Sequence, residues 1–206
     1  MEQAHNDAKT RILLASKKLF ALNGYDGTSV RQICEEANTN AALISYYFGG
    51  KEHVYQSLFE MYSPMNILTQ DRNISPVEGI RDIVKKMTEY RIEESEMISI
   101  IQQEIFMNSS RIQNYKKYIS EIWLTLKYYL EEGKKQGIFH FDSVDKALIY
   151  IIAILTFPNR FLNLDCIFQD EDLNEEEAIN DSFHFILRGL GCSAENDEVN
   201  NNEKLI

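Results

Sequence analysis

The chain has 206 residues, of which 44% are hydrophobic and 26% are charged, so it is long enough for one small and one medium folded domain. Its 21 Lys and Arg residues against 32 Asp and Glu residues give a formal net charge of −11, which excludes a uniformly basic nucleic-acid-binding surface. The absence of any long uncharged apolar stretch excludes a membrane-spanning helix, and three isolated cysteines argue against a disulfide framework, so we expect a soluble protein of the cytoplasm.

Four helices are predicted in residues 1–63. The first covers residues 7–22 and ends before Gly24. Thr28 is predicted as the N-cap of a short second helix, whose buried face contains Val30, Ile33 and Ala37. Asn40 is predicted to cap a third helix, which contains the run AALISYYF and is ended by two glycines. A fourth helix opens at residue 51 and reaches about residue 63.

The second and third helices are joined by only two residues, Asn38 and Thr39. A connection this short needs a left-handed backbone, which asparagine tolerates second best to glycine. Compact helices with this connection predict a helix-turn-helix. Within AALISYYF the adjacent residues Tyr46, Tyr47 and Phe48 cannot all face one core, so we expect Phe48 to be buried and at least one tyrosine to be exposed for function.

The rest of the chain is also predicted to be helical, which makes the fold class all-α. Helical patterns cover residues 76–92, 96–108 and 111–135, and the strongly apolar run KALIYIIAILTF follows a cap at Asp142 or Ser143 and ends at Pro158. The acidic stretch QDEDLNEEE enters a final helix that closes at residues 189–191. We therefore predict a helix-turn-helix domain in residues 1–63 with its fourth helix as the link, a larger helical domain in residues 64–191, and a disordered acidic tail in residues 192–206.

Aromatic and methionine side chains of residues 76–135 are predicted to face one interior, and we assign most of them to the core. A cavity in that interior would suit a small apolar or amphipathic ligand. Glu104 stands on an otherwise apolar helix, either as a group that orients a polar or cationic ligand or as a solvated carboxylate. The candidate ligand-binding residues are Met87, Tyr90, Met97, Ile101, Glu104, Trp123 and Leu126.

The first predicted helix ends in Phe-x-x-x-Gly-Tyr, and the run TSVRQICEEANTNAALISYYFGGKEHVY contains a Tyr-Phe pair shortly before Lys51 and Glu52. In these motifs and their spacing, over roughly residues 8–60, the chain resembles the tetracycline-repressor (TetR) family of transcriptional regulators. Beyond this region the resemblance lies in length and helical layout. Three positions depart from the family pattern, where glycine, valine and a DNA-contacting tyrosine are usual: Asn38, Thr39 and Ser45.

The resemblance implies a DNA-binding regulator. Its phosphate-holding residues would be Thr28, Tyr47 and Lys51, through hydroxyl and ammonium groups. In the major groove arginine pairs with guanine and methyl groups meet thymine, and the residues placed there would be Arg31, Asn40, Ala41, Ala42, Leu43, Ser45 and Tyr46. Residues 1–62 contain six basic and seven acidic residues, so the acidity lies mainly outside this segment.

The resemblance also implies a homodimer. The last two predicted helices are apolar over more than one face, and in the family such helices pair across a two-fold axis into a four-helix bundle. The alternative is a fully intramolecular core. Family habit further implies a repressor that binds a palindromic double-stranded operator and is released by a small apolar or amphipathic effector.

Two other classes of protein fit the sequence less well. An enzyme is disfavoured because the four histidines show no metal-ligand spacing and no glycine-rich phosphate loop occurs, so we expect neither a metal nor a cofactor. A helical protein-interaction adaptor without DNA binding is favoured by the acidic net charge. Salt-dependent DNA binding would separate an adaptor from a regulator.

Overall fold

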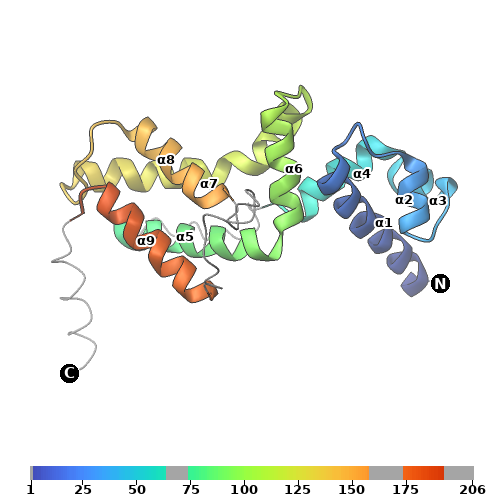
Figure 1. Cartoon of the computed structure of the whole chain (residues 1–206), viewed down its shortest axis with the longest axis horizontal. Helices are drawn as coiled ribbons and strands as arrows, with labels where there is room; N and C mark the ends of the chain where they lie inside the picture. The colour runs from blue at the N-terminus through green and yellow to red at the C-terminus, as the bar shows by residue number, and fades with distance from the viewer. Residues whose placement is uncertain (1, 64–73, 158–173, 193–206) are drawn as a thin grey trace, which may run out of the picture. The chain divides into compact units, whose positions relative to one another are not determined.

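The computed structural model describes residues 2–63, 74–157 and 174–192. These residues form helices and turns without any strand, which confirms the all-α prediction (Figure 1). The helices in chain order are α1 Glu2–Asn23, α2 Val30–Glu36, α3 Ala41–Phe48, α4 Lys51–Met61, α5 Pro76–Glu93, α6 Ser95–Phe106, α7 Arg111–Lys135, α8 Val144–Thr156 and α9 Glu175–Gly189. None of these helices is long and apolar enough to cross a membrane. The predicted helix end at Pro158 and all of the predicted tail except residue 192 lie outside the described residues.

Polar side chains fix where several helices begin. Asn40 caps α3, as predicted, because its side-chain oxygen accepts a hydrogen bond from the backbone of the first turn. Ser143, the second of the two predicted alternatives, caps α8. The prediction that Thr28 caps α2 is wrong, because the chain enters the helix one residue later. Ser29 and Gln32 form a capping box there, in which each side chain accepts a hydrogen bond from the other residue's backbone N–H.

The helices form two compact units that do not follow chain order. Among the described residues, unit 1 takes in 2–63 and 92–120, and unit 2 takes in 74–91, 121–157 and 174–192. The helices α5 and α7 each contribute to both units, whereas α6 belongs to unit 1. The boundary expected after residue 63 follows chain order, and the division into a domain of residues 1–63 and a domain of residues 64–191 stays a prediction.

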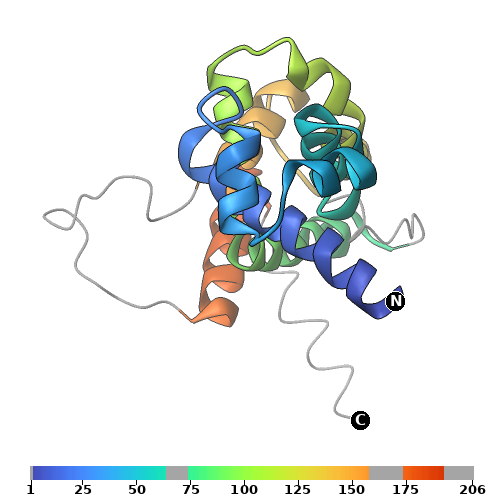
Figure 2. The same ribbon diagram turned by 90° about the vertical axis from the view of Figure 1, so that its right-hand side faces the viewer.

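Unit 1 is built around α1, which contacts α2, α4 and α6, while α3 contacts α2 and α4 (Figure 2). Ile33 and Ala37 are buried, as predicted, whereas Val30 is half-buried. The buried side chains of this unit also include Ile12, Phe20 and Ile44. Buried side chains of α4 complete this core, and each such large apolar side chain contributes about 1.5–3 kcal/mol to stability. They are Val54, Tyr55, Leu58 and Phe59.

Two polar contacts hold α6 and the residue before it against α1 within unit 1. The Lys17 ammonium is 2.6 Å from a carboxylate oxygen of Glu94 and lies 4.1 Å from the centre of the Tyr62 ring. The Gln103 side chain donates a 2.6 Å hydrogen bond to the carbonyl of Ala21, at the last turn of α1. Because both contacts are partly buried, they hold α1 and α6 together more firmly than exposed ion pairs would.

Unit 2 packs apolar faces of α5, α7, α8 and α9, and α8 contacts α9. Close packing is visible at Gly79 in α5, where a Cβ atom would lie 2.4–2.6 Å from ring atoms of the buried Tyr129. Only glycine leaves room for that ring, since real Cβ contacts are longer. The acidic first turn of α9 contains three glutamates, as the sequence predicted, and Asn174 caps it.

Candidate nucleic-acid interface

The turn between α2 and α3 is closed by Asn38, which has a left-handed backbone with φ 46°. This confirms the conformation predicted from the sequence. The N–H of Thr39 donates to the carbonyl of Cys34 at 2.9 Å, and the N–H of Asn38 donates to the carbonyl of Glu35 at 3.3 Å. These are the two bonds of a Schellman motif, which satisfies carbonyls left open at a helix end. The geometry of the helix-turn-helix is therefore held by backbone bonds.

The helix α3 sorts its mostly apolar residues onto two faces. Ile44 and Phe48 are buried, as predicted for Phe48, whereas Tyr46 is 71% exposed. The exposure of at least one tyrosine is therefore confirmed. The predicted DNA-facing residues on or next to α3 that are exposed are Asn40, Ala41, Ala42, Ser45 and Tyr46, and those that are half-buried are Leu43 and Tyr47.

Two predicted residues next to or within α2 have different surroundings. The Arg31 side chain is 87% exposed, and its Nε donates to a carboxylate oxygen of Glu35 at 2.8 Å. An exposed pair of this kind contributes little to stability, so the guanidinium can exchange partners readily. Thr28 is 1% exposed, and its hydroxyl faces the carbonyls of Leu19 and Gly24 at 3.1 and 2.8 Å. The hydroxyl predicted to hold a phosphate therefore points into the fold.

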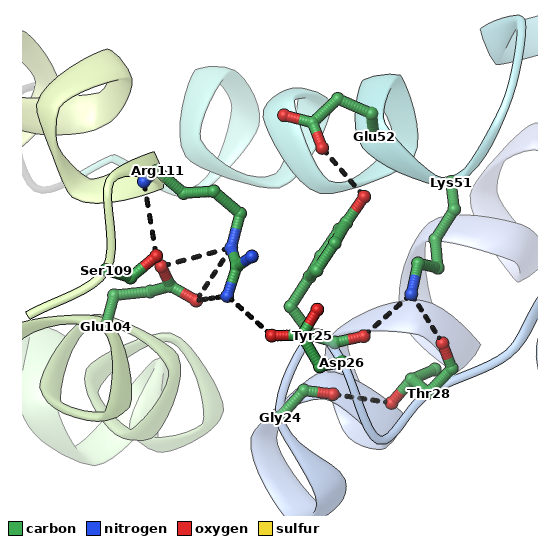
Figure 3. Close-up of polar contacts among 9 residues, drawn as sticks. All are labelled: Gly24, Tyr25, Asp26, Thr28, Lys51, Glu52, Glu104, Ser109 and Arg111. Atoms are coloured by element: carbon green, nitrogen blue, oxygen red, sulfur yellow. Dashed lines mark hydrogen bonds and ion pairs between the residues drawn. The ribbon is translucent and has the colours of Figure 1, made fainter. Parts of the chain in front are cut away.

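Lys51 lies at the start of α4 and holds the loop before α2. Its ammonium donates to the carbonyls of Tyr25 and Thr28, both at 2.8 Å, and lies 4.0 Å from the centre of the Tyr25 ring (Figure 3). Burial lowers the pKa of Lys51. These bonds use two of the three N–H groups of an ammonium, which leaves one more donor for a further acceptor.

The ring of Tyr25 connects this loop to the turn between α6 and α7. The Arg111 guanidinium lies 4.4 Å from the ring centre, on the side opposite Lys51 (Figure 3). It is 3.1 Å from a carboxylate oxygen of Asp26 and 3.3 Å from the carboxylate of Glu104. Burial, followed by a 2.7 Å hydrogen bond to a carboxylate of α4, raises the pKa of Tyr25 to about 12, so the phenol stays neutral at ordinary pH.

No local sequence pattern indicates the role of Arg111. It follows Asp26 by 85 residues, and no local spacing relates the two. Tyr25 belongs to the family motif Phe-x-x-x-Gly-Tyr, but the motif by itself indicates no contact with Arg111. A long-range contact of this kind becomes visible only when the packing of α6 against α1 is known.

The candidate ligand-binding residues do not all belong to one compact unit. Met97, Ile101 and Glu104 lie in unit 1, and the others, Met87, Tyr90, Trp123 and Leu126, lie in unit 2. The alternative that Glu104 is a solvated carboxylate is wrong, because its side chain is 5% exposed and faces Arg111. Contact of these residues with a ligand stays a prediction.

A short helix with an outward face, which follows a tight turn and packs against two neighbouring helices, defines the class of helix-turn-helix proteins. Comparison with known families supports this class over most of the chain. The family described as "Bacterial regulatory proteins, tetR family" matches residues 12–58, and "Tetracyclin repressor-like, C-terminal domain" matches residues 76–187. The chain belongs to the TetR family and is a transcriptional regulator with a DNA-binding helix-turn-helix.

Three named transcriptional regulators are similar to this chain and support its assignment to the family. The HTH-type transcriptional repressor NicS of Pseudomonas putida is 27% identical over 200 residues, which cover 91% of this chain and 94% of NicS. The probable HTH-type transcriptional regulator YttP of Bacillus subtilis is 31% identical over 161 residues, which cover 73% of this chain and 76% of YttP. The crystal structure of HlyIIR, a hemolysin II transcriptional regulator, is similar with a TM-score of 0.71 at 32% identity, covering 86% of this chain and 97% of that chain.

Proposed function

We propose that the protein is a repressor that binds a palindromic operator as a homodimer and releases it when a small apolar or amphipathic molecule binds. The observation that carries the proposal is the outward face of α3, where an apolar helix keeps four of its residues, including Tyr46, exposed. Repression is supported by the similarity to NicS, which is named a repressor. A protein with this role acts in the cytoplasm, where bacterial DNA lies.

In this proposal, α3 and Arg31 contact the DNA bases in the major groove. The methyl groups of Ala41 and Ala42 suit contact with thymine, and the exposed Arg31 suits a bidentate contact with guanine. Asn40, Leu43, Ser45 and Tyr46 complete the proposed face. A recognition helix with so few charged groups depends strongly on methyl contacts and on the shape of the groove.

In this proposal, Lys51 and Tyr47 bind phosphates of the DNA backbone. The remaining N–H of the Lys51 ammonium and the hydroxyl of the half-buried Tyr47 suit phosphate oxygens on either side of α3. Thr28 contributes through its carbonyl, which accepts a hydrogen bond from Lys51, because its own hydroxyl is buried. These contacts position the protein without reading sequence.

A homodimer through α8 and α9 is supported by large apolar side chains that are exposed in the single chain. They are Ile149, Tyr150 and Phe157 in or just after α8 and Phe185 in α9. Exposed apolar groups on adjacent helices favour burial against a second copy. We expect a mass in solution of twice the 24.0 kDa of the chain, and Phe185→Glu should shift it to the monomer.

The effector is proposed from the aromatic and methionine residues of unit 2, since Met87, Tyr90 and Leu126 are buried and Trp123 is half-buried. An operator-binding assay with apolar and amphipathic compounds and with cell extracts tests this part. Loss of operator affinity with one of them is expected. A series in which no compound or extract changes the affinity contradicts effector release and leaves DNA binding intact.

The experiment that tests DNA binding is selection of bound sequences from random double-stranded DNA. We expect a palindromic consensus, and Arg31→Ala should lose the preference for guanine at one position of each half-site. Lys85→Ala is a matched control, because it breaks an exposed ion pair of unit 2. If no sequence is enriched, the adaptor favoured by the net charge of −11 becomes the better reading.

A further inference from the structure

We propose that Arg111, at the start of α7, is a positioning residue for the DNA contact of Lys51 and acts on it through Tyr25 and Asp26. The inference rests on the proposed function, because it assigns Lys51 to a phosphate. It adds a residue that lies far outside the helix-turn-helix sequence. Four side chains in a row carry the argument: Glu104, Arg111, Tyr25 and Lys51 (Figure 3).

The position of Lys51 depends on the loop before α2. A lysine side chain is flexible and keeps one position only when its ammonium is held. Here the holding groups are the carbonyls of Tyr25 and Thr28 and the ring of Tyr25. Any shift of this loop therefore moves the ammonium and its remaining N–H.

The loop in turn depends on Arg111. Asp26 is 81% exposed and would be a weak anchor alone, but the Arg111 guanidinium bonds its carboxylate at 3.1 Å while lying over the Tyr25 ring. The planar guanidinium can serve both groups at once, which a lysine ammonium cannot do with the same geometry. Arg111 thus fixes the ring and the carboxylate that follow each other in the loop.

Arg111 is itself held by the end of α6. Its guanidinium faces the buried carboxylate of Glu104, and its backbone N–H donates to the Ser109 hydroxyl at 3.2 Å. Asn108 ends α6 in a left-handed conformation, and the N–H of Ser109 donates to the Glu104 carbonyl at 3.1 Å. The guanidinium therefore projects from a fixed turn, as a positioning residue requires.

Electrostatics link the same groups. Burial lowers the pKa of Lys51, while the carboxylate of Asp26 raises it and the guanidinium of Arg111 lowers it. The charge of Arg111 alone would push the ammonium away, so the neutralising carboxylates of Asp26 and Glu104 are part of the arrangement. An arginine placed here without them would oppose Lys51 rather than position it.

The test is a double-mutant cycle on operator affinity, with the operator selected by the wild-type protein. Arg111→Lys keeps a charge beside the buried Glu104, and Asp26→Asn changes an exposed group, so both variants should fold. We expect each to weaken binding several-fold and Lys51→Ala to weaken it about tenfold. The double variant Arg111→Lys/Lys51→Ala should bind within about twofold of Lys51→Ala alone.

The salt dependence separates positioning from a general loss of stability. Each lost phosphate contact makes the negative slope of log affinity against log salt less steep by about 0.9. Arg111→Lys should therefore reduce the steepness of this slope by up to about 1.8 in a dimer. Lys85→Ala should change neither the operator affinity nor the slope of log affinity against log salt. Circular-dichroism melting of every variant shows how much folded protein is present.

Three results overturn the inference. Multiplicative effects of Arg111→Lys and Lys51→Ala would show that the two residues act independently. An unchanged slope for Arg111→Lys, with a lowered melting temperature, would show a merely structural role. If Lys51→Ala binds the operator with wild-type affinity, Lys51 makes no DNA contact that Arg111 could position. DNA binding by the protein would still be established. Failure of the wild type to select any DNA would instead defeat the proposed function.

Discussion

Two aromatic residues of α3, two positions apart, should give opposite phenotypes when each is replaced by alanine. Tyr46 is 71% exposed, and Phe48 is 8% exposed. Tyr46→Ala should weaken operator binding and leave the fold intact. Phe48→Ala should unfold the protein more easily, because it empties a space in the core of unit 1.

The magnitudes follow from burial. Truncation of a buried phenylalanine costs about 3–5 kcal/mol of unfolding free energy, through lost burial and the cavity left behind. Tyr46 buries less than a third of its side chain, so its truncation should cost no more than about 0.5 kcal/mol. Loss of its contact in the major groove should cost about 1–2 kcal/mol of binding, or about a fivefold to thirtyfold loss of affinity.

Urea denaturation measures the first quantity and fluorescence anisotropy with labelled operator the second. Both variants are measured at a temperature where Phe48→Ala is still largely folded, and its affinity is corrected for the folded fraction. Unchanged affinity for Tyr46→Ala, or a loss of stability as large as that of Phe48→Ala, would refute the assignment of Tyr46 to the DNA-facing side.

Three further predictions concern the fold around the interface. Asn38→Ala should lower the unfolding free energy in urea by about 1 kcal/mol and Asn38→Gly should not, because alanine resists the left-handed backbone at φ 46°; equal stability of both variants would contradict this. Gly79→Ala should cost about 1–3 kcal/mol, since its Cβ would collide with the Tyr129 ring, and an unchanged urea midpoint would show that the ring yields freely. The pKa of Tyr25 rises to about 12 in the fold against about 10 unfolded, so the folded state keeps its proton longer and stability falls as pH rises through this window. Between pH 9 and 11 the wild type should lose about 1 kcal/mol relative to Tyr25→Phe, after allowance for partial exposure, and parallel pH profiles would contradict that shift.

Local signals in the sequence predicted most of the fold. The periodicity of apolar residues, the asparagine that caps a helix and the glycines that end helices each involve only a few neighbouring residues. The helices and the left-handed turn at Asn38 could therefore be expected from the sequence alone. The cap of α2 was misplaced by one residue because Thr28 and Ser29 are both good capping residues. Only the packing against α1, which buries the Thr28 hydroxyl, decides between them.

The parts of the site that could not be predicted depend on contacts distant in sequence. Nothing local shows that α6 packs with α1 through Gln103, or that Arg111 reaches Asp26. For the same reason the sequence predicts only two roles for Glu104, a ligand-orienting group or a solvated carboxylate. Its buried ion pair with Arg111 is neither of these. Such pairs are set by tertiary packing, which carries no sequence period.

The most direct measurement of the central claim, that the helix-turn-helix binds a DNA duplex, is the salt dependence of binding to the selected operator. We expect a linear fall of log affinity with log salt, with a slope of about −1.8 or steeper, because the two Lys51 side chains of a dimer each contact a phosphate. Lys51→Ala should reduce the steepness of that slope by the same amount. An affinity that does not change with salt, or a slope that Lys51→Ala leaves unaltered, would contradict the phosphate contacts on which the account depends.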